Sequence, residues 1–289
     1  MNPARNKAFT LVELLVVIAI VGILAVLAAP TLTAYRKDNA MTAATRQVLD
    51  DVARARQLAM AERTTVYMVF VPTNFWKNGL PPYSNWTFVP PAVRNSETVR
   101  QLYAAQWTGY AMFALHGVGD QPGRSFPRDI MSVKTLPPST FFSPLKFPGG
   151  PQSAPQPGHL PLLINGNIEV YSFQTTASLP FPTADMLASS APPSAFISVP
   201  YIAFNYLGQL VDSDGNVLPY DENIPLAHGS IAYWRDPATK MPVQPPPAQP
   251  AAVASIVENP PGNDTGISYN VIHIDRLTGR ARLQRQEVL

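Results

Sequence analysis

Residues 7–24, which read KAFTLVELLVVIAIVGIL, decide the organisation of this chain. Between Phe9 and Leu32 the only charged residue is Glu13. A helix of about 20 apolar residues crosses the ~30 Å hydrocarbon core of a bilayer, so this segment is long enough to do so. A carboxylate inside such a segment costs roughly 2.5–3.5 kcal/mol on insertion scales, which indicates that Glu13 has a role and a partner.

The order of residues also carries a family resemblance. Phe-Thr-Leu-Val-Glu at 9–13, ahead of a hydrophobic run, resembles the amino-terminal signature of type IV pilins and type II secretion pseudopilins. In that family a membrane peptidase cuts before the Phe and methylates the new amino terminus. The resemblance implies that residues 1–8 are a cleaved basic leader, that Ala8 and Phe9 flank the cut, and that prepilin peptidase is a partner. Ala8 departs from the glycine that the family usually has there.

The resemblance also assigns roles within the helix. It implies that Glu13 pairs with the methylated amino terminus of a neighbouring subunit during assembly, since opposite charges attract strongly in a low dielectric. The alternative is a carboxylate near the membrane interface with no role. Pro30 removes a backbone donor and Gly22 weakens the helix, so both predict a kink or a loosened region.

Charges around the apolar segment predict its orientation. Arg5 and Lys7 precede it, so the leader should stay in the cytoplasm and the rest should be exported, with residues 9–30 in the inner membrane. A cleaved secretory signal peptide ending near residues 28–30 is the competing interpretation. The apolar run is too long for one, and an amphipathic helix follows directly.

Composition excludes several classes of function. The 289 residues carry a net charge of +2 and only 14 % charged residues, which gives no reason to expect nucleic-acid binding. The chain has no cysteine, so disulfides, zinc–thiolate sites and thiol nucleophiles are excluded together. Four basic residues cluster near the carboxy terminus and are expected on a solvated strand face: Arg276, Arg280, Arg282 and Arg285.

The pattern after Pro30 is that of an amphipathic helix. Apolar residues recur at three- and four-residue steps and share one face: Met41, Ala44, Val48, Val52, Ala55 and Ala59. Arg46, Asp50, Arg54 and Glu62 mark the wetter sides. Neither glycine nor proline occurs from Thr31 to Tyr67, which predicts an unbroken helix to about Glu62, and residues 31–63 as the exported half of it.

Residues 64–289 predict a β-rich domain interrupted by proline-rich loops, and therefore an α+β fold in which the long helix packs on an antiparallel sheet. A short helix is expected at 96–107 with Ser96 as its cap. The strongest hairpin is predicted at 162–171, around Asn165-Gly166. Other strands are predicted at 64–71, 109–115, 195–199, 201–205, 209–212, 216–218, 229–234, 267–275 and 280–286. Irregular segments are predicted at 72–95, 135–161 and 242–250.

Two carboxy-terminal segments carry a second resemblance. Tyr201-Ile202-Ala203-Phe204 with Gly208-Gln209-Leu210, and the hairpin at Thr278-Gly279-Arg280, are similar to minor pseudopilins of the H type.

Other motifs do not indicate catalysis. Asp212-Ser213-Asp214-Gly215-Asn216 lacks the helix–loop–helix calcium spacing and is predicted as a hairpin turn. The four histidines lack metal-binding spacing, and His273, between two isoleucines, is expected to be a surface or sheet-packing residue. We therefore predict no enzyme activity, no cofactor and no metal.

These observations predict a structural subunit of minor-pseudopilin type in a type II secretion-type pseudopilus. Its partners would be other pilin or pseudopilin subunits, the inner-membrane assembly platform and the lipid bilayer. The alternative within this class is a minor pilin of a type IV pilus. A membrane-tethered ligand- or carbohydrate-binding module is the alternative of another class, with sugars stacking on exposed Trp76, Trp86, Trp107 or Trp234, and an anchored hydrolase is a third.

Overall fold

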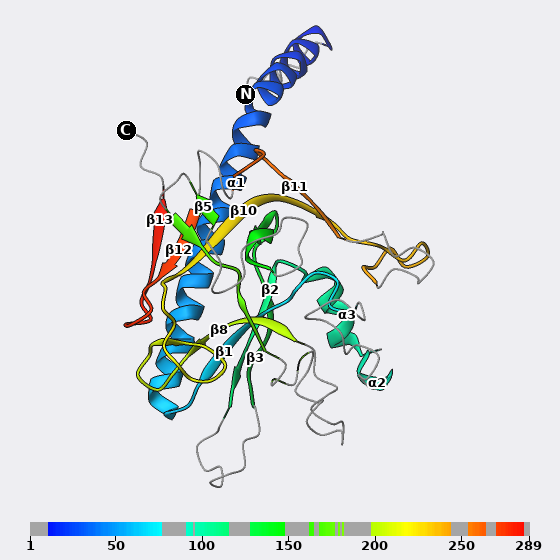
Figure 1. The fold of residues 1–289 in the computed structure, drawn as a ribbon. Helices are drawn as coiled ribbons and strands as arrows, with labels where there is room; N and C mark the ends of the chain where they lie inside the picture. Colours follow the sequence, from blue (N-terminus) through cyan, green and yellow to red (C-terminus); the bar gives the residue numbers. More distant parts are fainter. Residues whose placement is uncertain are drawn as a thin grey trace, which may run out of the picture. The chain divides into compact units, whose positions relative to one another are not determined.

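The computed structural model describes residues 11–76, 91–94, 96–115, 128–147, 162–164, 168–176, 179, 181, 198–243, 254–263 and 270–285. The chain divides into two compact units, Met1–Ala40 and Met41–Leu289. The fold is α+β, as predicted: an amino-terminal helix and antiparallel sheets (Figure 1).

Helix α1 spans Leu11–Glu62 without interruption. Its end is a Schellman motif, in which Arg63 adopts a left-handed conformation (φ 51°) and the Thr64 N–H donates to the Ala59 carbonyl at 3.2 Å. The predicted end near Glu62 is therefore confirmed. The predicted boundary between residues 30 and 31 has no counterpart in the secondary structure, because the helix continues through it, and the membrane and exported halves stay a prediction.

The first sheet has six strands, in the order β3 (Arg128–Thr135), β2 (Gly109–Ala114), β1 (Val66–Phe70), β8 (Val199–Phe204) and β7 (Gln174–Thr176), with β9 (Leu210–Val211) paired to β8. All pairs are antiparallel. β1 is buried along its whole length because both faces of the sheet are covered.

Alternate residues of β1 belong to two separate cores. Met68 and Phe70 pack with the α1 face that contains Val48 and Val52. Tyr67 and Val69 pack on the other side with α3 (Glu97–Ala104). The period of two along a strand thus places one set of side chains on each face.

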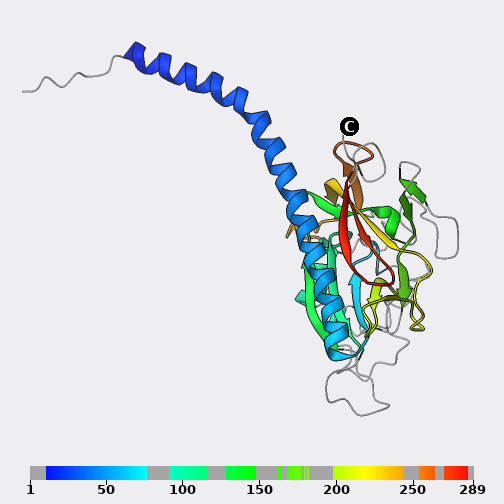
Figure 2. The same cartoon turned by 90° about the vertical axis from the view of Figure 1, so that its left-hand side faces the viewer.

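The second sheet joins β11 (Ser255–Glu258), β10 (Glu222–Ala232), β12 (Asn270–Ile274) and β13 (Ala281–Arg285), with β4 (Thr140–Phe142) paired to β10. Figure 2 shows the β12–β13 hairpin alongside the lower half of α1. Ile272 and Ile274 join the same core as the helix face. A separate two-stranded ladder pairs β5 (Leu162–Ile164) with β6 (Ile168–Val170).

Most predicted elements are confirmed. The six apolar positions predicted between Met41 and Ala59 all face the core, five of them fully buried and Met41 partly. Ser96 caps α3, its hydroxyl accepting from the Val99 N–H at 3.3 Å. The hairpin at 162–171 forms, although its turn at 165–167 lies outside the described residues, as do parts of the irregular segments.

Several predictions around prolines were wrong. Strand β8 runs through Pro200, where two strands were predicted, and β10 begins at Glu222 and includes Pro225, rather than beginning at Gly229. In each case the ladder to one neighbour ends at the proline: β1 pairs only with residues 201–204 of β8, and β4 only with 226–228 of β10. The missing N–H therefore falls where the ladder to that neighbour ends, a position at which proline is tolerated.

Six described elements were not predicted, including strand β7 and the 3₁₀ turn Pro144–Lys146. Strand β3 at the sheet edge is largely polar and exposed, and β11 is short and half exposed. Strand β4 lies inside the segment predicted to be irregular. The single turn α2 (Pro91–Arg94) likewise falls within the predicted loop 72–95.

Candidate functional site

The processing and assembly residues belong to the first part of the chain. Ala8 and Phe9 lie outside the described residues. Glu13 lies in the first turn of α1 and is exposed. A carboxylate near a helix amino terminus is stabilised by the unpaired N–H groups and by the helix dipole. None of these observations tests the processing or assembly roles, which stay predictions.

Exposed apolar side chains surround this part of α1. Relative exposures lie between 48 and 80 % for the eleven large apolar residues of residues 11–24. A helix that is apolar on every side is characteristic of burial in a nonpolar medium or against other chains. Within the described residues, no helix was found to be both long and apolar enough to traverse a membrane.

Gly22 and Pro30 both lie inside the continuous helix. A Cβ added to Gly22 would meet no atom within 4 Å. Glycine is therefore not required there by packing within the chain. The kink predicted at these two residues stays a prediction.

A polar clamp attaches the second half of α1 to the edge of the first sheet. The Asp51 carboxylate accepts from the Tyr110 hydroxyl at 2.5 Å and from the Lys134 ammonium at 2.6 Å. Gln47 donates to the Tyr110 hydroxyl and to the Thr135 carbonyl, each at 2.9 Å. Burial, and the hydrogen bond to Asp51, raise the pKa of the Tyr110 phenol above its ordinary value, so the phenol stays protonated and donates.

Two further contacts attach the end of α1. Arg128 of β3 forms an ion pair with Glu62, its Nη2 donating to both carboxylate oxygens at 2.9 and 2.7 Å. The Arg56 guanidinium donates to the Thr278 carbonyl at 2.5 Å, in the turn between β12 and β13. These bonds and the clamp join α1 to both sheets.

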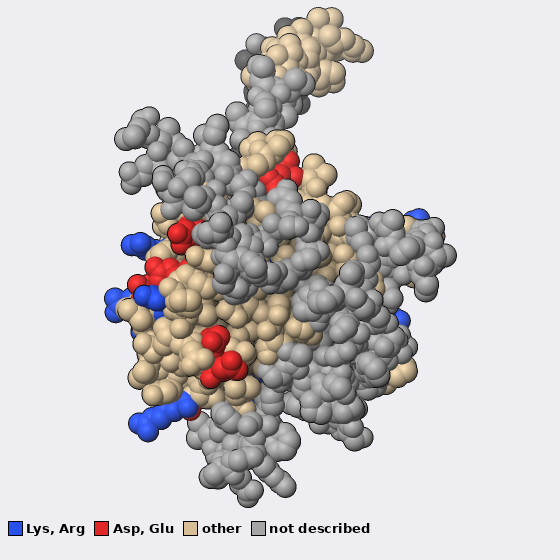
Figure 3. Space-filling view, viewed as in Figure 1, with Lys and Arg blue, Asp and Glu red and all other residues tan. Residues whose placement is uncertain are grey.

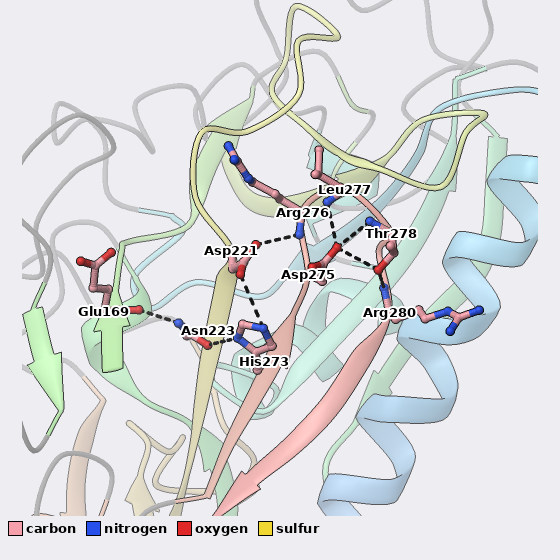
Figure 4. Close-up of polar contacts among 9 residues, drawn as sticks. All are labelled: Glu169, Asp221, Asn223, His273, Asp275, Arg276, Leu277, Thr278 and Arg280. Carbon is pink, nitrogen blue, oxygen red and sulfur yellow. Dashed lines mark hydrogen bonds and ion pairs between the residues drawn. The ribbon is translucent and has the colours of Figure 1, made fainter. Parts of the chain in front are cut away.

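The β12–β13 turn is organised by Asp275 (Figure 4). Its carboxylate accepts from the Leu277 and Thr278 N–H groups at 3.1 and 2.7 Å and from the Thr278 hydroxyl at 2.8 Å. These hydrogen bonds lower the pKa of Asp275 below its ordinary value because they stabilise the charged form. The turn predicted at residues 277–279 is confirmed.

His273 lies beside this turn in a chain of polar contacts (Figure 4). Asn223 donates to the Glu169 carbonyl at 2.7 Å, which orients its amide oxygen toward the His273 Nδ1 at 3.0 Å. The other ring nitrogen faces the Asp221 carboxylate at 3.6 Å. Burial lowers the pKa of His273, and Arg282 lowers it further, against the opposing effect of Asp221 and Asp275.

This arrangement orients an imidazole, and its contacts among the described residues are an amide and a carboxylate rather than a hydroxyl. His273 packs within the sheet, which is one of the two positions predicted for it. Arg280 and Arg282 are exposed, as expected for a solvated strand face. The side chain of Arg285 is not among those that the structure describes.

The Asp212–Asn216 segment forms the predicted turn. The Asp212 carboxylate accepts from the Asp214 and Asn216 N–H groups at 2.9 and 2.8 Å, and Gly215 has φ 84°. Its oxygens are therefore used within the turn. Among the residues that the structure describes, no group of three or more metal-ligating side chains is placed to hold an ion.

The tryptophans that the structure describes do not form an exposed platform. Trp107 is fully buried and Trp76 is 6 % exposed, Trp234 is half-buried, and Trp86 lies outside the described residues. A hollow of about 490 Å³ lies beneath β10, between residues 135–141 and Tyr233, and the residues that line it are uncharged. On the face shown in Figure 3, described basic and acidic side chains are interspersed along one edge, and no continuous basic patch forms there.

The polar contacts of the unit that begins at Met41 were not identified from the sequence. Asp51 had a signal: it lies three residues after Val48 and four before Ala55, so it occupies the buried stripe. Its partners Tyr110 and Lys134 are 59 and 83 residues away, and no local pattern connects them.

Comparison with known proteins gives one match. Residues 3–29 match the family model described as the prokaryotic N-terminal methylation motif. The match includes Ala8, Phe9, Glu13 and Gly22, and it confirms the resemblance to the type IV pilin and pseudopilin signature. No curated protein and no solved structure matches the chain.

Proposed function

We propose that this chain is a structural, non-catalytic subunit of minor-pseudopilin type in a type II secretion-type pseudopilus. Prepilin peptidase removes residues 1–8 and methylates Phe9. Residues 9–30 anchor the subunit in the inner membrane, with the amino terminus cytoplasmic and the domain from 64 onward exported.

The observation that carries this proposal is the methylation motif at residues 3–29, which runs into a helix whose apolar side chains are exposed on all sides. An exposed apolar helix requires lipid or other helices around it. Neighbouring subunits and the bilayer supply both, before and after assembly.

Glu13 gives the helix a means of assembly. Cutting before Phe9 creates an ammonium in the same apolar layer as this carboxylate. Either charge alone is penalised in a low dielectric, and a pair between neighbouring subunits removes much of that penalty. The uncut precursor lacks the ammonium and assembles poorly.

A pseudopilus is favoured over a type IV pilus because the proline-rich insertions would crowd a densely repeated filament. The second resemblance, in the carboxy-terminal hairpins, supports the same choice. A tethered carbohydrate-binding module is less favoured, since the stacking surface would have to come from tryptophans, and Trp76 and Trp107 are buried.

The experiment uses the full chain expressed with a prepilin peptidase and its assembly system. Mass spectrometry should find mature chains that begin at methylated Phe9. Glu13→Gln should be processed normally but should be lost from assembled filaments. The control Glu97→Gln changes the same chemical group at an exposed position of α3 and should assemble normally. A mature chain beginning at or after Pro30, or normal assembly of Glu13→Gln, would refute the proposal.

A further inference from the structure

A buried ion pair joins two distant parts of the exported domain. Lys146 ends the 3₁₀ turn Pro144–Lys146, and Glu222 begins β10. The side chains are 0 and 2 % exposed, and the ammonium contacts both the Glu222 carboxylate and the Tyr171 carbonyl. Ionised side chains this deeply buried are uncommon because both lose their hydration.

The backbones that carry the two groups are held by other bonds. Ser143 caps the 3₁₀ turn, its hydroxyl accepting from the Leu145 N–H at 3.2 Å. The Phe173 N–H donates to the Lys146 carbonyl at 2.8 Å. Glu222 lies in the ladder opposite Ile274 of β12. The two side chains are therefore brought together by the fold and not only by their own attraction.

The surroundings are aromatic and dry. The Phe173 ring centroid lies 4.6 Å from Lys146 Nζ, and the Phe147 ring meets Phe173 edge-on at 5.5 Å. Burial lowers the pKa of Lys146 and raises the pKa of Glu222, because it disfavours both charged forms. Transfer of one proton within the pair gives a neutral amine beside a neutral carboxylic acid.

We propose that Lys146 and Glu222 condense to a side-chain amide, which forms an intramolecular isopeptide cross-link. The lone pair of Nζ adds to the Glu222 carboxyl carbon and forms the C–N bond. A proton passes from Nζ to the leaving hydroxyl oxygen, the C–O bond breaks, and one water leaves. Atoms and electrons balance, and no oxidant or further reactant is needed.

Two physical effects favour the reaction. Fixed neighbouring groups react as if at very high concentration, because the entropy of bringing them together is already spent in folding. A site that excludes water lacks the reactant for the reverse hydrolysis. The Tyr171 carbonyl accepts one N–H of Lys146 and thereby orients the amine.

The cross-link would join residues 76 positions apart in a chain without cysteine. It supplies the covalent constraint that disulfides provide in other exported domains. The inference does not depend on the proposed function, because it concerns only the folded domain.

The experiment is a peptide digest of the purified full chain in detergent, after denaturation. Cleavage before aspartates releases residues 129–184, with Lys146, and residues 221–235, with Glu222. We expect these two peptides joined, with a combined mass lower by one water. Dehydration of Asp214-Gly215 to a succinimide would alter residues 214–220 instead and is therefore distinguished.

Lys146→Arg is the matched variant, since it keeps the cation but does not form the amide, and it should yield two separate peptides. The closed loop should also make denatured wild-type chains migrate faster on a denaturing gel than Lys146→Arg chains, and Lys134→Arg should migrate as wild type. Separate, full-mass peptides from folded wild-type protein would overturn the proposal, and that result does not require the variant to fold.

Discussion

At the scale of single residues, Asp51 is the buried carboxylate of the polar clamp between α1 and the first sheet. Its side chain is 7 % exposed and holds both Tyr110 and Lys134, whereas the Lys134 side chain is 42 % exposed. Loss of the carboxylate leaves the buried phenol without its acceptor, while the ammonium can rehydrate.

Asp51→Ala should therefore lower the free energy of unfolding by about 2–3 kcal/mol, less than the loss of one partner from a fully buried pair. The neighbouring exposed carboxylate provides the control: Asp50→Ala should change the free energy of unfolding by less than about 0.5 kcal/mol. Urea unfolding of both variants measures the difference. Equal effects of the two substitutions would show that the polar clamp contributes no more to stability than an exposed carboxylate does.

His273 makes stability depend on pH. Since burial lowers its pKa in the folded state from the ordinary value of 6.5, the unfolded chain binds more protons just below that pH. Its contribution to stability is complete above the unfolded pKa and is lost as the pH falls toward the folded pKa.

Urea unfolding measured from roughly pH 7 down to pH 5 should show this loss in the wild type, and a smaller loss in His273→Gln, which cannot titrate. Arg282→Gln should narrow the pH range over which this stability is lost, because it removes a cation that lowers the pKa of His273. An unchanged pH dependence in His273→Gln would contradict the assignment.

At the scale of elements, the β12–β13 turn is pressed against both the β8–β9 turn and α1. Gly279 has φ 61°, and a Cβ there would overlap the Gly208 carbonyl oxygen and lie 3.1 Å from an Arg56 side-chain carbon. Gly215 also has positive φ, at 84°, but a Cβ there would meet nothing within 4 Å.

The two glycines separate backbone strain from close packing. Gly215→Ala should cost about 1–2 kcal/mol, the penalty of a left-handed conformation for a residue with a Cβ. Gly279→Ala should cost roughly 3 kcal/mol or more, because backbone atoms must also move. Thermal or urea unfolding of the two variants tests this. Similar costs would mean that the turn is not tightly docked.

Strand predictions from the sequence succeeded where the local rule on which they were based also holds in the tertiary structure. The β-branched and aromatic run of β1 and the Asn-Gly hairpin of β5–β6 follow local rules, and both were predicted. Pro200 and Pro225 break such a rule, and only their position at the end of a ladder makes them acceptable within β8 and β10. Edge strands such as β3 and β11 have only a partly buried face, which imposes a weaker pattern.

At the scale of the whole molecule, the first part of the helix and the domain that follows it have different kinds of surface. Residues 11–24 expose apolar side chains almost everywhere, whereas the unit that begins at Met41 buries most of its apolar residues in two cores on either face of the first sheet. The first kind of surface suits lipid or neighbouring helices, and the second is complete in a single chain. This division agrees with a subunit that assembles through its helix and carries an independently stabilised domain.

The sequence by itself determined the long helix, its buried stripe, its end near Glu62, the cysteine-free β-rich domain and the methylation motif. Each of these depends on neighbours within a few residues, so periodicity and composition carry the information. Only the tertiary structure decided which strands pair, that prolines lie inside two of them, and that Asp51 meets Lys134 and Lys146 meets Glu222. The two side-chain contacts join residues 83 and 76 positions apart in the sequence. At such separations burial, and not local conformational preference, selects the partner.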